Sequence, residues 1–253
     1  MHKGYIIIGD VHNESNLLGH AIDYALHNEL RMVFVGDLVD YGPTPAETIH
    51  MAYNLMNNHN AIFIEGNHDN KINRYLLGND VTISHGMVST IEALKHDKVS
   101  DMFKSIYENM LPLLVIGDTH ITHGAFTSSY WTDDVDVKKH NRARLYGEID
   151  KSKPFVEWNG QQYPARTYAW VDSIPSDKTV IVGHDRSPFH EVPAFESNIN
   201  EIVESTNDQG GKVYFTDTGA GKGGFVSGVV LDNDGLVVNT VCLLYTSPSP
   251  RDS

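Results

Sequence analysis

The chain has 253 residues, of which 40% are apolar, with a single cysteine and a formal net charge of -14. A chain of this length can bury one substantial core, and we expect residues 1–241 to form a single domain. The lone Cys242 excludes an internal disulfide and a cysteine-based metal site. The acidic balance argues against stable nucleic-acid binding through a broad basic surface, whereas a phosphate substrate remains compatible if bound cations dominate the local field.

We expect neither a membrane span nor a secretion leader in this sequence. The chain contains no apolar stretch of about eighteen residues and no basic, apolar leader, so we expect no membrane span, no secretion signal and a cytoplasmic location. The last stretch, residues 242–253 (CLLYTSPSPRDS), changes abruptly to Ser, Pro and Arg. It resembles a translated sequencing adapter or a disordered tail, and we expect it to carry no chemistry.

Short apolar runs separated by helical patterns organise the first part of the chain. Apolar residues with helical spacing predict helices over residues 16–30 and 45–56. Short runs rich in β-branched residues predict buried strands at 5–8, 32–35, 61–64 and 180–182. The order strand, helix, strand, helix, strand indicates right-handed crossovers and a largely parallel sheet.

The middle and later parts of the chain predict a second sheet. Further helices are expected at 71–77 and 88–107, and further strands at 113–116, 120–123, 213–216 and 225–230, the last continuing into 236–241. We expect this later sheet to be mostly antiparallel. The predicted fold class is α/β (α+β), with two mixed β-sheets packed as a sandwich and flanking helices.

Polar clusters follow the predicted strands, at the edge where open α/β sheets collect ligands. The clusters are Gly9-Asp10-Val11-His12, the run from Gly36-Asp37 to Asp40, Gly66-Asn67-His68-Asp69, His123-Gly124 and Gly183-His184. Asp, Asn and His together are the ligands of Mn, Fe or Zn rather than of calcium. Any one motif alone is more often a turn, but several in this order after strands indicate a metal site.

These motifs resemble the calcineurin-like metallophosphoesterase superfamily and its phosphoprotein-phosphatase branch, whose pattern is G-D-x-H-G, G-D-x-x-D-R-G, G-N-H-E/D and two later histidines. Residues 66–86, 145–148 and 217–219 are similar to the phosphatase module of bacterial polynucleotide kinase-phosphatase and to the related bacterial diadenosine-tetraphosphatase group. The resemblance implies a metallophosphoesterase fold and two divalent ions. Mn²⁺ is the expected metal, with Fe and Zn as alternatives.

The resemblance also implies a role for each matching residue. Asp10 and His12 would hold the first metal, Asp37 would bridge, and Asn67, His123 and His184 would complete the second site. His68, oriented by Asp40, would act as general acid or charge stabiliser, and Asp217 would support the metal shell. Hydrolysis would proceed by direct attack of a metal-bound hydroxide, without a covalent phosphoenzyme.

The sequence departs from the family pattern at one substrate-binding position. Tyr41 stands where the pattern has arginine, which removes a bidentate phosphate clamp. We name Tyr41, Arg144 and Arg186 as candidate substrate-binding residues, although a solvated surface arginine is an equally good interpretation of the last two. Residues 219–224 (GAGKGG) lack P-loop spacing, so we expect a flexible hairpin or rim loop there. Trp131, Asp133, Asp134 and Asp136 are expected to lie in an ordinary solvated loop.

The sequence therefore predicts a metal-dependent phosphoric ester hydrolase, a phosphatase of the Ser/Thr protein phosphatase-like branch. Dinucleoside polyphosphate hydrolysis and nucleic-acid-end phosphatase activity are alternatives, as is a weakly active regulatory metal-binding module, which Tyr41 motivates. The expected partners are phosphorylated small molecules, nucleotides or proteins, and the oligomeric state is left open.

Overall fold

The first of the two main sheets combines three parallel strands with an antiparallel hairpin. The computed structural model describes residues 2–131, 141–158, 161–186, 188 and 201–243. The strand order of this sheet is β14-β13-β1-β2-β3. Its strands are β1 (Gly4–Ile8), β2 (Leu30–Phe34), β3 (Ile62–Phe63), β13 (Val226–Leu231) and β14 (Val237–Leu243). β1, β2 and β3 are parallel, as the sequence predicts, whereas β13 pairs antiparallel with both β1 and β14.

The second sheet is mixed, which corrects the prediction of a mostly antiparallel one. Its order is β11-β12-β10-β5-β4, and the central strand β10 is parallel to both of its neighbours. Only the edge pairs are antiparallel, and the hairpin β13–β14 joins the first sheet instead. The strands are β4 (Leu114–Ile116), β5 (Thr119–Ile121), β10 (Thr179–Val182), β11 (Val203–Thr206) and β12 (Lys212–Phe215).

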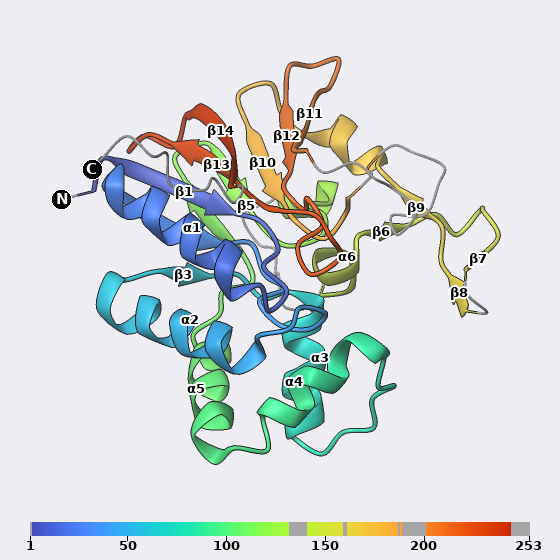
Figure 1. The fold of residues 1–253 in the computed structure, drawn as a ribbon. Coiled ribbons are helices and arrows are strands. Elements are labelled where there is room, and N and C mark those ends of the chain that lie inside the picture. The colour runs from blue at the N-terminus through green and yellow to red at the C-terminus, as the bar shows by residue number, and fades with distance from the viewer. Residues whose placement is uncertain (1, 132–140, 159–160, 187, 189–200, 244–253) are drawn as a thin grey trace.

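Helices cover the outer face of the first sheet (Figure 1). The predicted helix over 88–107 is two helices, because the extended backbone at His96 separates them and the acidic Asp97 begins the second. The helices on this side are α1 (Ser15–His27), α2 (Pro45–His59), α3 (Asn67–Leu76), α4 (Val88–Ala93) and α5 (Asp97–Glu108), with the short η1 (His85–Met87) before α4.

The core has three layers, and β1 shows how the sequence builds them. Ile6 and Ile8 face α1 and α2, whereas Ile7 points to the second sheet and packs with Ile121 and Ile181. Alternate residues of a strand point to opposite faces, so a strand buried on both sides needs a continuous apolar run. Burying one such side chain contributes roughly 1.5–3 kcal/mol. A third cluster, which includes Phe126, Trp170 and Phe215, covers the far face of the second sheet.

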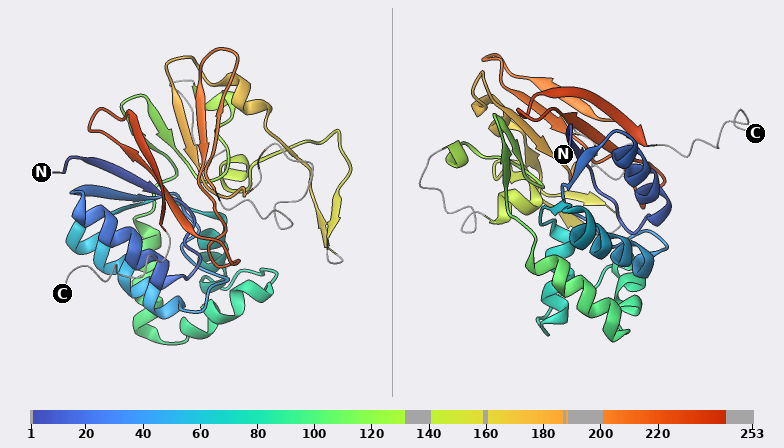
Figure 2. Two further views of the ribbon diagram at one scale, coloured as in Figure 1. Left: turned by 45° about the horizontal axis from the view of Figure 1, so that its top comes forward. Right: turned by 90° about the vertical axis from the view of Figure 1, so that its left-hand side faces the viewer.

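Smaller elements lie between β5 and β11 in sequence, and the β7–β8 ribbon extends away from both sheets (Figure 2). They are η2 (Ser128–Trp131), α6 (Asn141–Tyr146), β6 (Glu148–Ile149), β7 (Val156–Trp158), β8 (Gln161–Tyr163), β9 (Arg166–Thr167) and η3 (Ala169–Ser173). In the described part of the chain, no helix is long and apolar enough to cross a membrane.

The predicted tail begins two residues too early. Cys242 and Leu243 belong to β14, where they pair with Ser227 and Val226. Residues 244–253 lie outside the described residues, as do Asp133, Asp134 and Asp136; Trp131 ends η2.

Candidate metal centre

The predicted site residues meet where the carboxyl ends of strands from both sheets come together. The loops after β2 and β3 pack backbone to backbone: a Cβ on Gly36 would lie 2.7 Å from the Gly66 Cα, and one on Gly66 would lie 2.1 Å from the Asp37 nitrogen. The buried Asp69 carboxylate joins these loops by accepting hydrogen bonds from the Leu38 and Gly66 N–H groups, each at 3.1 Å. The two glycines therefore permit an approach that any side chain would block.

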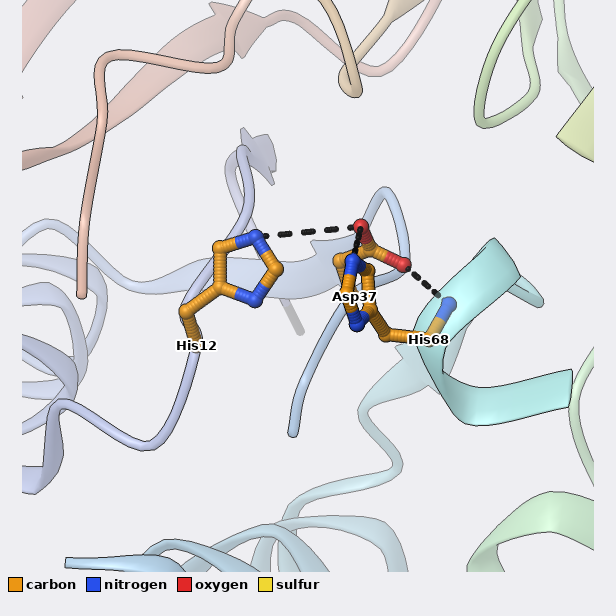
Figure 3. Close-up of side chains that lie close together, drawn as sticks. All are labelled: His12, Asp37 and His68. Atoms are coloured by element: carbon orange, nitrogen blue, oxygen red, sulfur yellow. Dashed lines mark hydrogen bonds and ion pairs between the residues drawn. The ribbon is translucent and has the colours of Figure 1, made fainter. Parts of the chain in front are cut away.

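Asp37 lies at the centre of the site. Its Oδ2 is 3.7 Å from His12 Nε2 and 4.0 Å from His68 Nε2, and Figure 3 shows both imidazoles beside this carboxylate. Its Oδ1 is 3.4 Å from His123 Nε2 and accepts a 2.9 Å hydrogen bond from the His68 N–H. Two groups of side chains could each hold a metal ion, and they share Asp37: one contains His12 and His68, the other His123 and His184.

Backbone carbonyls fix the orientation of two of the histidines. His12 Nδ1 and His123 Nδ1 each lie 2.9 Å from a carbonyl oxygen, of Val39 and Val35 respectively. A carbonyl only accepts, so each Nδ1 carries a proton and each Nε2 faces the site. The Nε2 atoms of His12 and His184 are buried without a hydrogen-bond partner. Because an unpaired buried nitrogen is costly, these orphaned atoms fit metal coordination.

The remaining predicted ligands border the same space. Asn67 Oδ1 is 3.0 Å from His123 Nε2. Asp10 accepts the His184 N–H at 3.1 Å, and its Oδ2 is 3.8 Å from His12 Nε2. The structure thus brings together all six residues that sequence reasoning named as ligands.

Closely spaced buried carboxylates and imidazoles define the electrostatics of the site. Burial raises the pKa of Asp10 well above its ordinary value, and the nearby Asp217 carboxylate raises it further. Burial also acts to raise the pKa of Asp37, but His123 and His68 outweigh it, so this pKa lies well below its ordinary value. Burial acts to lower the pKa of His123, yet Asp37 and Asp10 raise it to about 9. Crowded acids of this kind are typical of sites that bind cations.

Asp217 and the His68–Asp40 pair lie beside the six residues named as ligands. Asp217 follows β12, accepts the Gly219 N–H at 2.9 Å through Oδ1, and buries Oδ2 without a partner. His68 Nδ1 is 2.7 Å from Oδ2 of the fully buried Asp40, while the His68 side chain keeps 14% exposure. Asp40 therefore orients an imidazole whose other nitrogen faces Asp37 and solvent.

The three candidate substrate-binding residues lie in different environments. Tyr41 is 41% exposed, and its ring makes edge contacts with His12 and His68 at centroid distances of 4.9 and 5.1 Å. Arg144 is only 1% exposed and donates to Glu65 at 2.6 Å. Arg186 is 7% exposed, with its guanidinium packed against Gly219. Neither arginine is a solvated surface residue, so that interpretation is wrong for both.

Two cations beside the site were not found from the sequence. Lys222 Nζ lies 4.4 Å from the Tyr41 ring centroid, and Arg166 Nη1 lies 3.3 Å from Asp185 Oδ2. Burial lowers the pKa of His12 well below its ordinary value, with Lys222 as the next cause; burial and then Arg166 do the same for His184. The only feature of the sequence that could have indicated Lys222 is its place in the predicted rim loop. Arg166 follows no motif that could have indicated it.

The backbone of the site loops is strained. Six residues other than glycine adopt a positive φ here, between 48° and 77°: His12, Asn13, Asp37, Asp40, Tyr41 and His184. A positive φ is uncommon outside glycine, most of all for a bulky residue such as Tyr41, and such conformations concentrate at functional sites. These residues are the site residues and their neighbours. The positive φ angles therefore occur in the same region as the unpaired Nε2 atoms of His12 and His184.

Two mixed sheets that place shared carboxylates and imidazoles at one edge define the class of metallophosphoesterases. The chain belongs to the calcineurin-like phosphoesterase family, whose model matches residues 5–208. Membership in this family implies a dinuclear divalent metal centre, which agrees with the two groups that share Asp37.

Two similar proteins carry the name bis(5'-nucleosyl)-tetraphosphatase PrpE [asymmetrical]. The chain is 31% identical over 197 residues to the bis(5'-nucleosyl)-tetraphosphatase PrpE [asymmetrical] of a Geobacillus species, covering 70% of this chain and 77% of that protein. It is 29% identical over 221 residues to the protein of the same name from Bacillus subtilis, covering 78% and 84%.

Solved structures show the same fold at lower identity. A cold-active protein-tyrosine phosphatase from a Shewanella species matches with a TM-score of 0.60 and 16% identity, covering 96% of this chain and 81% of that one. A metallophosphoesterase from Sphaerobacter thermophilus matches with a TM-score of 0.55 and 15% identity, covering 97% and 90%. These likenesses support the fold alone.

Proposed function

We propose that the chain hydrolyses dinucleoside polyphosphates, such as a dinucleoside tetraphosphate, at a centre of two divalent ions. The observation that carries this proposal is Asp37, whose two carboxylate oxygens face separate groups of imidazoles. Two ions, when bound there, supply positive charge for the phosphate and lower the pKa of water. We propose Mn²⁺ as the metal, because carboxylate, amide and imidazole donors together suit it.

Side chains of the protein bind the two ions, donate a proton and position the neighbouring loop. In this proposal, Asp10, His12 and Asp37 hold one ion, and Asn67, His123, His184 and Asp37 hold the other. His68 donates a proton to the leaving phosphate oxygen, held by Asp40 at 2.7 Å. Asp217 fixes the loop beside Asp10 through its bond to Gly219.

An exposed aromatic ring near the site favours a nucleotide over a simple phosphate ester. Tyr146 is 37% exposed and close enough for Asp37 to affect its pKa. Nucleobases stack on such rings, each contact contributing about 1–3 kcal/mol in single-stranded nucleic-acid complexes. The relatives named bis(5'-nucleosyl)-tetraphosphatase support the same choice.

Three other functions remain candidates. The Ser/Thr protein phosphatase-like reaction and the nucleic-acid-end reaction need the same centre and differ in the group beside the reacting phosphate. A weakly active regulatory module is favoured only by Tyr41, which brings no charge to the phosphate.

Turnover by the purified chain with added Mn²⁺ tests these alternatives. We expect diadenosine tetraphosphate to be cleaved with a higher kcat/KM than a phosphoserine peptide, a 5'-phosphorylated oligonucleotide or p-nitrophenyl phosphate. Preference for the peptide or the oligonucleotide would replace the proposed substrate. Inactivity toward all four with Mn²⁺, Fe²⁺ or Zn²⁺ would overturn the enzymatic function itself.

A further inference from the structure

Lys222 extends from the glycine-rich loop over the edge of the metal centre. Its ammonium lies 4.4 Å from the centroid of Tyr41, and that ring in turn contacts His12 and His68. The described residues include ion pairs for Lys3, Lys95, Lys104 and Lys178, but none for Lys222. Among the residues that the structure describes, no carboxylate forms an ion pair with this ammonium beside the site.

The loop that carries Lys222 is fixed at both ends. Gly219 donates to Asp217 at 2.9 Å and accepts from the N–H groups of Lys222 and Gly224 at 3.0 and 2.9 Å. Its tip approaches the site so closely that a Cβ on Gly221 would lie 2.8 Å from the His12 Cβ. The short turn and the missing side chain therefore bring the lysine stem to the rim of the centre.

The contact between Lys222 and Tyr41 positions the ammonium but holds it weakly. A lysine over an exposed tyrosine ring gains less than a hydrogen bond to a charged group does. A phosphate that enters the site can therefore take the ammonium as a partner. Lys222 is exposed at the rim whereas His12 and Asp37 are buried, so the ammonium lies outward of the metal ligands, on the side toward which the next group of the substrate would extend.

We propose that Lys222 binds the non-reacting phosphate adjacent to the one that is hydrolysed, and so makes the site selective for phosphate chains over single phosphates. This inference deepens the proposed function, on which it rests, by naming a specificity-determining residue. The ammonium supplies the charge that Tyr41 lacks, but one phosphate further along the chain. A phosphomonoester has no group at that position.

Competition with phosphate chains of different length tests this inference. Hydrolysis of p-nitrophenyl phosphate would be inhibited with orthophosphate and with inorganic tripolyphosphate, at a constant concentration of free Mn²⁺. In Lys222→Gln, we expect the ratio of the tripolyphosphate Ki to the orthophosphate Ki to rise about tenfold, as for the loss of one charge-assisted hydrogen bond. Lys222→Arg should retain most of the selectivity, since it keeps the charge.

Lys212→Gln is the matched control. Lys212 is exposed at the start of β12, the strand that leads to Asp217 and the loop, so its replacement makes the same charge change at the opposite end of that strand. The Ki ratio of this variant should equal that of the parent chain. Calorimetric titration of tripolyphosphate into the Mn²⁺-loaded proteins gives the same comparison without turnover.

The outcomes separate this inference from the proposed function. An unchanged Ki ratio in Lys222→Gln, or an equal loss of orthophosphate and tripolyphosphate affinity, overturns the assignment to the adjacent phosphate. If the parent chain fails to cleave diadenosine tetraphosphate but the Ki ratio changes as expected, the dinucleoside substrate is wrong and the role of Lys222 stands.

Discussion

Replacing His68 with alanine separates proton donation from metal binding. His68 belongs to one of the two groups that could hold a metal ion, yet its Nδ1 already contacts Asp40 at 2.7 Å. Its Nε2 is 4.0 Å from Asp37 Oδ2, farther than the 3.7 Å of His12 Nε2. The geometry therefore favours a proton donor over a ligand, and we expect His68→Ala to retain both ions.

The size of the effect follows from the chemistry of the leaving group. A positioned general acid contributes about 10²–10⁴-fold to the rate, and it matters most when the leaving oxygen is a strong base. We expect His68→Ala to lower kcat by about 10³-fold with phenyl phosphate and by about tenfold with p-nitrophenyl phosphate, whose leaving group is stable as an anion. Asp40→Asn, which keeps the shape but removes the charge that orients His68, should cost about 10- to 100-fold.

Steady-state kinetics with the two esters measures the loss of kcat, and metal analysis of the same protein samples measures the number of bound ions. Asn70→Ala is a suitable control, because Asn70 lies on α3 near His68 but donates to Glu65 rather than to a site residue. Loss of one metal ion together with activity would show that His68 is a ligand. An equal loss of rate with both esters would refute proton donation to the leaving group.

Two further predictions concern the bridging carboxylate and the buried arginine. Asp37→Asn should abolish turnover and reduce bound metal from two ions toward one or none, measured by elemental analysis; a variant that keeps both ions would contradict the bridging role. Arg144→Met leaves the largely buried Glu65 without its 2.6 Å partner and should cost about 3 kcal/mol of stability, lowering Tm by about 6–12 °C in thermal unfolding. Glu65→Gln in the same protein should recover part of that loss, whereas an unchanged Tm with weakened substrate binding would favour the substrate-binding role for Arg144.

The parallel part of the fold could be predicted because each buried strand is a short apolar run with its polar cluster directly behind it. The run before Asp10 and the run before Asp37 become β1 and β2, paired in parallel as expected. The second sheet was harder, since β10 pairs with β5 and β12, which are far from it in sequence. Local patterning gives the existence of a strand but not its partner, so the parallel centre of this sheet was missed.

The same distinction applies to the site. Ligand-type residues after strands converge because the carboxyl ends of parallel strands share an edge, which is why all six predicted ligands meet. Arg144 and Lys222 could not be placed in this way. The partner of Arg144 is Glu65, 79 positions away, and Lys222 reaches Tyr41 only because its loop folds back over His12. Such contacts depend on tertiary packing and leave no local pattern.

Tyr41 links the strain of the site to its specificity. Its φ of 64° is rare for a bulky side chain, and two contacts with Gly86 hold it: Tyr41 donates its N–H to the Gly86 carbonyl, and a Cβ on Gly86 would lie 2.7 Å from the ring. A left-handed conformation of this kind costs on the order of 1–2 kcal/mol, which the surrounding packing must offset. Specific contacts therefore hold the Tyr41 ring in the site, and the ring does more than leave the position of the family arginine uncharged. The uncharged Tyr41 ring stands where the family pattern has arginine, and Lys222 lies over this ring. The positive charge is therefore farther from the reacting phosphate, at a position that a phosphate chain can reach and a single phosphate cannot.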